Sequence, residues 1–371
     1  MRTVMMVCDR RELTMALSVA TPRLRTGLVL GAGGVLGAAW MAGALAALQQ
    51  RWPYPVGTVD LIVGTSAGSA MAAALRCGVA VEDIVEHQRG TALALLPDLS
   101  AIDRDAGGPL PPLPLMRVGS PRLLLSMALA PLRVHPWVAA SALVPQGRAR
   151  HTSLEGLVRG LLAQAEADPR PATARTTRDG WTPGGETWVM AVDYDSGRRV
   201  AFGRAGAPPA TLPEAVVASC SIPGWYRPAM IAGRRYVDGG VHSTTSLDLL
   251  ADVDLDEIYV LAPMASYVLD SPSNPYARLE RGLRRVITLG LQREARKVQA
   301  RGIRVVVLTP GPEDLTAIGA NLMDPRRRIQ VLDTSLRTSA AALAALERDR
   351  RGARQAGQAR PATGEVGSCS S

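Results

Sequence analysis

One pattern near the start of the sequence restricts the fold more than any other. A short apolar stretch, a glycine-rich turn and an alanine-rich stretch follow one another over residues 27–50, with the turn at 31–37. The same order recurs over residues 59–75, with the turn at 64–68. A buried strand, a tight turn and a covering helix, used twice in succession, are typical of a parallel sheet with helices packed on it. The sequence therefore predicts an α/β fold.

Strand-like and helix-like stretches continue to about residue 348. The predicted strands are residues 27–30, 59–63, 188–192, 199–202, 234–237, 258–262 and 303–308. The predicted helices are residues 38–50, a stretch ending near 75, 153–162, 212–219, 276–300 and 326–348. We expect one large domain over residues 25–348, with a central, mainly parallel sheet flanked by helices. Residues 1–24 are predicted to be an irregular leader and residues 349–371 a disordered tail.

Residues 97–150 differ from this pattern. Four prolines cluster there, namely Pro109, Pro111, Pro112 and Pro114. They precede an apolar stretch over residues 123–132 that has Arg122 and Arg133 at its ends. Proline-punctuated segments of this kind predict an irregular insertion and not an element of the sheet.

The overall charge favours anionic partners. The formal net charge is +9, which suits lipid headgroups or nucleic acid. No basic stripe with interleaved aromatic residues is visible, and this argues against nucleic acid. The apolar region over residues 123–144 contains charged residues and prolines, so it falls short of a membrane span.

The cysteines and the N-terminal residues bear on the compartment. The four cysteines stand far apart, at Cys8, Cys77, Cys220 and Cys369. This spacing indicates neither a zinc site nor a disulfide framework, and it fits a reducing compartment. The apolar residues 4–7 are too few for a signal peptide. We therefore expect a cytoplasmic protein, peripheral to a membrane and without a metal.

The second turn, Gly64-Thr65-Ser66-Ala67-Gly68, matches the pattern G-x-S-x-G between a predicted strand and a predicted helix. In such a turn a serine is held in a strained backbone, and side chains two residues to either side would clash. A helix N-terminus also favours a developing negative charge. An ordinary tight turn would explain the glycines alone, but the strand–turn–helix context favours Ser66 as a nucleophile.

The first turn, Gly31-Ala32-Gly33-Gly34-Val35-Leu36-Gly37, has two interpretations. A dinucleotide-binding loop would need glycine where Leu36 stands and an acidic residue further on, which is missing. An oxyanion hole needs backbone N–H groups that converge on one oxygen, and consecutive glycines permit this. With a serine turn on the adjacent predicted strand, we favour the oxyanion hole.

A third motif, Asp238-Gly239-Gly240, follows a predicted strand and by itself would indicate only a turn. A glycine-rich loop, then G-T-S-A-G, then a late D-G-G, in this order, resembles the patatin-like phospholipase family. Residues 212–240, including Ala-Ser-Cys-Ser-Ile-Pro at 218–223, also resemble the family's segment before its catalytic aspartate. The resemblance covers about residues 25–345 and implies a three-layer α/β/α fold.

The resemblance also implies roles for individual residues. Ser66 would be the nucleophile and Asp238 its base, in a dyad that works without histidine. The backbone around Gly33, Gly34 and Val35 would form the oxyanion hole. The supporting glycines of the three motifs are Gly31, Gly37, Gly64, Gly68, Gly239 and Gly240. The reaction would be hydrolysis of fatty-acyl esters of lipids through an acyl-enzyme, with no metal or organic cofactor. Independently of the resemblance, the apolar stretch with an arginine at each end predicts that residues 101–144 cap the site and contact an anionic lipid surface.

Several alternatives stay open. The family often has Arg or Lys where this chain has Leu36, and if that cation assists catalysis, Leu36→Arg would raise turnover. His242 follows Asp238 too closely for the usual spacing of a Ser–His–Asp triad, and His87, His135 and His151 stand in no motif.

A carboxylesterase or thioesterase would use the same dyad, whereas a silent lipid-binding protein would form no acyl-enzyme. The apolar stretch of the insertion would instead be one more core helix.

Overall fold

The computed structural model describes residues 23–91, 99–105, 107–108, 110–115, 117–129, 134–167, 181 and 185–358. The strands are β1 Thr26–Leu30, β2 Leu61–Thr65, β3 Glu186–Asp193, β4 Arg199–Phe202, β5 Ala229–Ile231, β6 Arg234–Asp238, β7 Glu257–Leu261 and β8 Arg304–Leu308. The α-helices are α1 Gly34–Gln49, α2 Ala67–Arg76, α3 Val81–Gln88, α4 Leu99–Asp105, α5 Pro121–Leu129, α6 Pro136–Leu143, α7 Thr152–Ala167, α8 Leu212–Cys220, α9 Pro275–Gln299, α10 Pro312–Ile318 and α11 Arg328–Gln358. Short 3₁₀ turns are η1 Val56–Thr58, η3 Gly239–Val241, η4 Leu247–Asp252 and η5 Pro325–Arg327.

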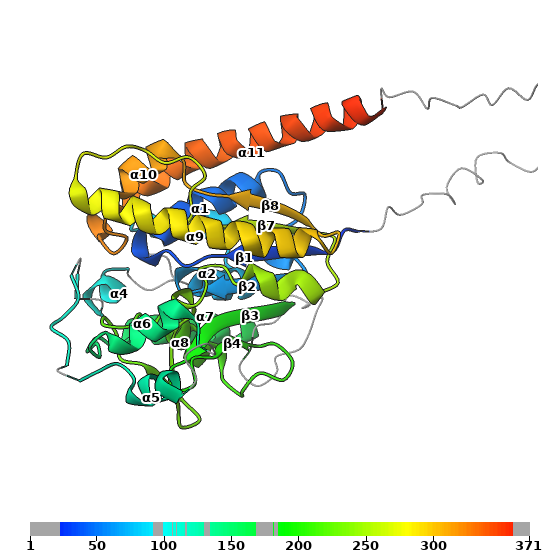
Figure 1. The fold of residues 1–371 in the computed structure, drawn as a ribbon. Coiled ribbons are helices and arrows are strands. Elements are labelled where there is room, and N and C mark those ends of the chain that lie inside the picture. Colours follow the sequence, from blue (N-terminus) through cyan, green and yellow to red (C-terminus); the bar gives the residue numbers. More distant parts are fainter. Residues whose placement is uncertain are drawn as a thin grey trace, which may run out of the picture.

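The strands form one sheet between two layers of helices (Figure 1). Its hydrogen-bonded path runs β5–β6–β3–β2–β1–β7–β8, and β4 also pairs with β3. The pairs from β3 through β2, β1 and β7 to β8 are parallel, whereas β4, β5 and β6 pair antiparallel. The predicted fold class, a mainly parallel sheet flanked by helices, is confirmed.

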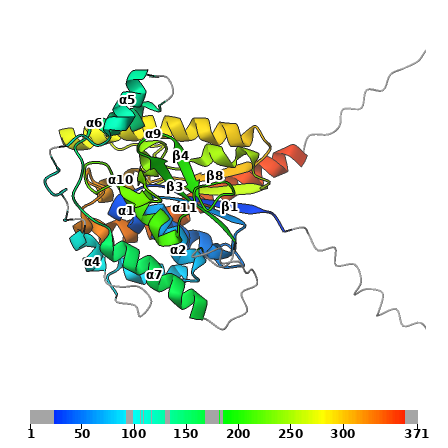
Figure 2. The ribbon, with the colours of Figure 1, turned by 90° about the horizontal axis from the view of Figure 1, so that it is seen from below.

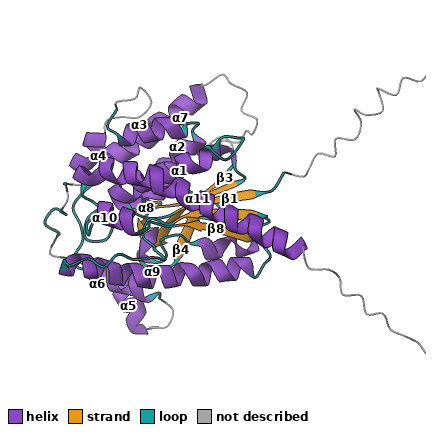
Figure 3. Cartoon of the chain, turned by 90° about the horizontal axis from the view of Figure 1, so that it is seen from above, coloured by secondary structure: helices purple, strands orange, loops and turns teal. Residues whose placement is uncertain are grey.

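Side chains that point alternately to the two faces of the sheet explain why helices cover both faces. Leu28 and Leu30 of β1 belong to the core shared with α1, α2, α7, α8 and α11, while Val29 belongs to the core under α9 and η4. This period of two is what a strand buried on both faces requires. Figure 3 shows α1, α2 and α7 on one side of the strands and α9 on the other. Gly43 of α1 permits close packing of α11, because a Cβ there would lie 2.7 Å from the Cβ of Ser335.

The predicted boundaries differ from the structure in several places. Helix α1 begins at Gly34, four residues earlier than predicted, and β2 begins at Leu61 and ends at Thr65. Helix α11 continues to Gln358, so residues 349–358, predicted as disordered, are helical. The rest of the predicted tail and residues 1–22 of the predicted leader lie outside the described residues.

The described part of the insertion, residues 97–150, contains the three helices α4, α5 and α6. Leu123 of α5 and Val138 of α6 are fully buried against Val192, Tyr194 and other core residues at one end of the sheet. Figure 2 shows α5 and α6 on the same side of the sheet as α9. In contrast, α4 packs beside α7 on the other side. The insertion is therefore divided between the two helical layers.

Candidate active site

Ser66 lies in the turn between β2 and α2 with a positive φ of 53°, a conformation that is strained for a residue with a side chain. The glycines around it have no room for a side chain. A Cβ on Gly64 would lie 2.6 Å from the Cα of Ser69, and one on Gly68 would lie 2.0 Å from the carbonyl oxygen of Leu30. Close packing of the turn against β1 and α2 therefore holds Ser66 in this conformation.

Strand β3 determines where Ser66 and Asp238 lie relative to each other. Thr65 of β2 pairs with Met190, and Asp238 of β6 pairs with Ala191, the next residue of β3. Because β4 pairs with Val189–Val192 along the opposite edge, β2 and β6 share one edge of β3 and meet end to end. The two strand ends thus bring Ser66 and Asp238 together.

Ser219 at the end of α8 connects these strand ends. Its hydroxyl donates to the carbonyl oxygen of Met190 at 2.7 Å and accepts from the backbone N–H of Ser66 at 2.8 Å. The side chain is fully buried. Sequence reasoning did not assign Ser219 a role, and the only signal was its place in the segment over residues 218–223.

Asp238 is buried, and the Ser66 side chain is close enough to influence the pKa of its carboxyl group. Burial raises the pKa of its carboxyl group to about 6, although the Ser66 side chain and a hydrogen bond from the Gly240 N–H act in the opposite direction. The Gly240 N–H lies 2.7 Å from Oδ1 of Asp238. Because the ionised carboxylate is destabilised by burial, Asp238 is a stronger base than an exposed aspartate.

The predicted oxyanion loop lies at the N-terminus of α1. The N–H groups of Ala32 and Leu36 donate to backbone carbonyls elsewhere in the protein. Those of Gly33, Gly34 and Val35 lie between them at the helix start, where N–H groups have no intrahelical acceptor. Within the described residues, these three N–H groups are available to a ligand oxygen.

Pro263, two residues after β7, packs against this loop. A Cβ on Gly33 would lie 2.6 Å from Cγ of Pro263, and one on Gly37 would lie 3.2 Å from the same ring. A Cβ on Gly31 would lie 3.3 Å from its Cδ. Gly34 adopts a φ of +59°, which favours glycine. The loop glycines thus admit the proline ring and the turn into α1.

The D-G-G turn is equally tight. A Cβ on Gly239 would lie 2.6 Å from the carbonyl oxygen of Met190, at the point where β2 and β6 meet. One on Gly240 would lie 3.0 Å from Oδ1 of Asp238. Both glycines let the chain turn immediately after Asp238 while its carboxylate faces Ser66.

A cavity of about 160 Å³ adjoins Ser66, Gly34 and Val35. Most of its wall is apolar, with residues from α1, α2, α3, α4 and α7. The apolar lining includes Ala38, Ala70, Met71, Ala74, Ile84, Leu99, Ile102, Leu154 and Leu157. Of the insertion, α4 contributes to this wall, whereas no residue of α5 or α6 that the structure describes does so. The cavity provides an apolar space beside the serine.

The histidines lie in other environments. His242 stacks on His135 at 4.6 Å between ring centroids, and both line a second cavity that Ser66 does not line. Burial, aided by Arg199 and His135, lowers the pKa of His242 to about 4. His151 lines the first cavity, but its Nε2 is 2.9 Å from the carbonyl oxygen of Cys220 and burial lowers its pKa to about 4.

The comparisons with known proteins place the chain in a family. The profile described as Patatin-like phospholipase matches residues 28–251, which is more than half of the chain. The chain belongs to the patatin-like phospholipase family, and so to a class of lipid acyl hydrolases. No curated protein matches the sequence significantly.

Solved structures give more distant similarities. VipD from Legionella pneumophila is 14% identical with a TM-score of 0.37, covering 84% of this chain and 67% of that one. The ExoU–SpcU complex of Pseudomonas aeruginosa is 16% identical with a TM-score of 0.34, covering 90% and 61%. Human GIVD cytosolic phospholipase A2 is 15% identical with a TM-score of 0.35, covering 86% and 57%. The chain thus spans about three fifths to two thirds of these proteins, and family membership rests on the profile match.

Two further properties concern only the part of the chain that the structure describes. In it, no group of three or more His, Cys, Asp and Glu side chains is placed to hold a metal ion. None of its helices is both long enough and apolar enough to cross a bilayer.

The structure changes the expectation for Leu36. Its side chain is fully buried in the core beneath α1 and α11, so an arginine there would enter the apolar core instead of reaching the site. We now expect Leu36→Arg to unfold the protein, because an unpaired buried charge costs several kcal/mol. Leu36→Met, which conserves volume, should cost less than about 1.5 kcal/mol. Urea denaturation of both variants measures this, and a stable, more active Leu36→Arg protein would contradict it.

Proposed function

We propose that this protein hydrolyses fatty-acyl esters of lipids with Ser66 as nucleophile and Asp238 as general base. The observation that carries the proposal is the register of β3, which brings the two residues together at Met190 and Ala191. The burial of the Asp238 carboxyl group and the influence of the Ser66 side chain on its pKa support it. A hydroxyl paired with a buried base is the arrangement that nucleophilic catalysis requires.

The reaction follows from this arrangement. The Asp238 carboxylate accepts the proton of Ser66 while Oγ attacks the ester carbonyl carbon. The N–H groups of Gly33, Gly34 and Val35 stabilise the negative charge that develops on the carbonyl oxygen. Protonated Asp238 then gives its proton to the departing alcohol, leaving an acyl-serine. Water, deprotonated by Asp238, attacks this ester, and release of the fatty acid returns the proton to Ser66.

The apolar cavity supports a lipid acyl chain as the substrate group. It begins at Ser66 and Gly34 and continues between α2 and α7, past Met71 and Leu157. Buried methylene groups are stabilised by about 0.8 kcal/mol each, so a long acyl chain gains more from this cavity than a short one. An acetyl ester would use the same dyad but leave most of the cavity empty.

Arg284 supports the oxyanion loop from the other side of Pro263. Its Nη1 donates to the carbonyl oxygen of Pro263 at 2.6 Å, and the proline ring packs against Gly33 and Gly37. Arg284 is fully buried and paired with Glu280. The guanidinium thus acts through Pro263 as a positioning group for the loop.

The nucleophile is tested by covalent labelling. A fluorophosphonate with a long alkyl chain should modify Ser66 and no other serine, because only an activated hydroxyl reacts. Mass spectrometry of the labelled protein identifies the site.

Asp238→Asn should lower kcat by roughly a thousandfold or more while the fold is retained. His242→Ala is the matched control and should keep most of the activity; full labelling of Ser66→Ala would refute the assignment.

The pH profile tests the base. Because Asp238 must be ionised to accept a proton and its pKa is about 6, kcat/KM should level off above pH 7. Below the pKa it should fall about tenfold per pH unit. His151 and His242, with pKa values of about 4, do not titrate near this inflection. The same inflection should persist in His242→Ala, and its disappearance there would assign the base to histidine.

Arg284 and Arg281 offer a matched pair for testing the loop. Both pair with Glu280, but Arg281 donates to the carbonyls of Leu315 and Gly319 and not to Pro263. Arg284→Met should lower kcat roughly tenfold to a hundredfold with little change in KM, since displaced donors weaken transition-state binding. Arg284→Lys should recover part of the loss. Arg281→Met should lower thermal stability but keep kcat, and equal kcat losses in both Met variants would reduce Arg284 to a structural role.

A further inference from the structure

Helix α9 carries an unusual set of exposed apolar side chains. Tyr276 and Leu279 are 78% and 76% exposed, and Leu283 and Val286 follow at helical spacing on the same outer side. Tyr267 and Val268, in the loop before α9, are also exposed. We call these six residues the docking face. Exposed apolar groups gathered in this way mark a contact surface and not a random scatter.

The docking face adjoins the active-site edge of the sheet. Tyr267 and Val268 follow β7 at its carboxyl end, the end from which the oxyanion loop also leaves β1. Arg284, one residue after Leu283, reaches Pro263 against that loop. Figures 1 and 3 show α9 along the outside of the sheet, so its outer side faces away from the core.

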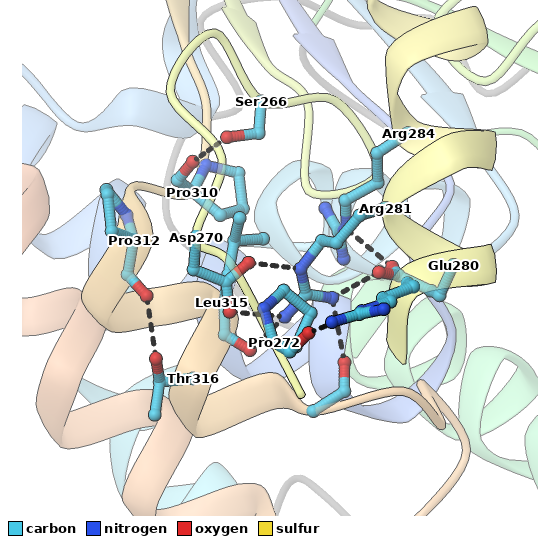
Figure 4. Close-up of polar contacts among 12 residues, drawn as sticks. Ser266, Asp270, Pro272, Glu280, Arg281, Arg284, Pro310, Pro312, Leu315 and Thr316 are labelled. Atoms are coloured by element: carbon cyan, nitrogen blue, oxygen red, sulfur yellow. Dashed lines mark hydrogen bonds and ion pairs between the residues drawn. The ribbon is translucent and has the colours of Figure 1, made fainter. Parts of the chain in front are cut away.

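The acidic groups of this region are turned inward. Asp270 and Glu280 bind Arg281, and Glu280 also binds Arg284, in the cluster drawn in Figure 4. Glu294, the remaining acid between residues 267 and 300, accepts hydrogen bonds from Ser243, Thr245 and Leu247. All three are partly buried.

The basic groups outside this cluster point outward. On α9 the exposed cations are Arg278, Arg285, Arg293, Arg296 and Lys297. The outer side of the helix therefore combines apolar side chains with positive charge and offers no exposed carboxylate of its own. This combination complements a surface that is apolar beneath a negatively charged layer.

We propose that the docking face binds the surface of an anionic lipid bilayer and that α9, not α5, makes the main contact. The inference rests on the proposed function, because a lipid hydrolase must reach its substrate at such a surface. Tyr276, Leu279 and Leu283 enter the acyl boundary, and Arg278 and Arg285 pair with headgroup phosphates. On α5, in contrast, Leu123 is buried and Leu124 packs against the core.

A groove connects the docking face with the turn after Asp238. A cavity of about 500 Å³ lies between α6 and α9 and is lined by Trp137, Leu283, Val286 and Gly240. Trp137 is itself half exposed, and tryptophan at such a rim suits the headgroup region of a bilayer. The same groove is also lined by polar and charged side chains, among them His242, Asp248 and Glu294, and it joins the docking face to the D-G-G turn.

Vesicle binding tests the proposal without depending on catalysis. All proteins carry Ser66→Ala, so that no lipid is hydrolysed during the assay. Each protein is sedimented with phosphatidylcholine vesicles that contain either no anionic lipid or about 30% phosphatidylglycerol. The fraction that sediments gives the partition coefficient. Tyr276→Ser with Leu279→Ser should weaken binding to anionic vesicles at least about tenfold, since two apolar anchors are lost. Arg278→Gln with Arg285→Gln should weaken binding to anionic vesicles only, by roughly tenfold. Both positions of the first variant are exposed, so its melting temperature should match the parent's.

The matched control places the same change on the insertion. Leu113 and Leu125 are 85% and 63% exposed, and Leu113→Ser with Leu125→Ser should bind vesicles as the parent does. The proposal is overturned if the control loses binding while the α9 variant keeps it, or if the parent binds no anionic vesicle. It is also overturned if the α9 variant converts a dimer to a monomer in light scattering with unchanged vesicle binding, because the face then serves a second copy. Failure of the proposed dyad would appear in fluorophosphonate labelling and not in these measurements.

Discussion

The pairing of β3 with two strands along one edge is the constraint on which the candidate site depends. A parallel strand, β2, and an antiparallel strand, β6, approach each other end to end, and their meeting point is Met190–Ala191. A slip of one residue would turn every side chain of either strand to the opposite face. The cores on both faces prevent such a slip, because Val63 and Trp188 pack on one side while Ile62 and Val189 pack on the other. Core packing thus controls the separation of Ser66 from Asp238.

Tight packing at this junction also determines its electrostatics. Ser219 satisfies the Met190 carbonyl and the Ser66 N–H, so no water is needed between the strand ends. Burial then raises the pKa of Asp238. The pairing that positions the carboxylate therefore also makes it more basic than an exposed aspartate, as the proposed role of Asp238 as general base requires.

The sequence predicted the fold class and most strands because buried parallel strands and glycine turns leave strong local signals. It predicted the neighbourhood of Ser66 and Asp238 only through motif order, since the pairing of residue 65 with 190 and of 191 with 238 is nonlocal. Ser219 carried no distinguishing local pattern for the same reason. The side chain of Leu36 points into the core because Leu36 lies in the first turn of α1, which begins at Gly34. The helix predicted from the sequence began four residues later, at residue 38.

Helix α9 shows why inner and outer roles can share one segment. At 100° per residue, Leu283 and Arg284 are neighbours in sequence but point to different sides. Leu283 belongs to the docking face, whereas Arg284 reaches Pro263 and, through it, the glycines of the proposed oxyanion loop. From the sequence, residues 276–300 are predicted only as a helix. With the inner arginines fixed by Asp270 and Glu280, the helix is tied to the loop as a unit, so contact at the proposed lipid-binding side bears directly on the position of the proposed oxyanion donors.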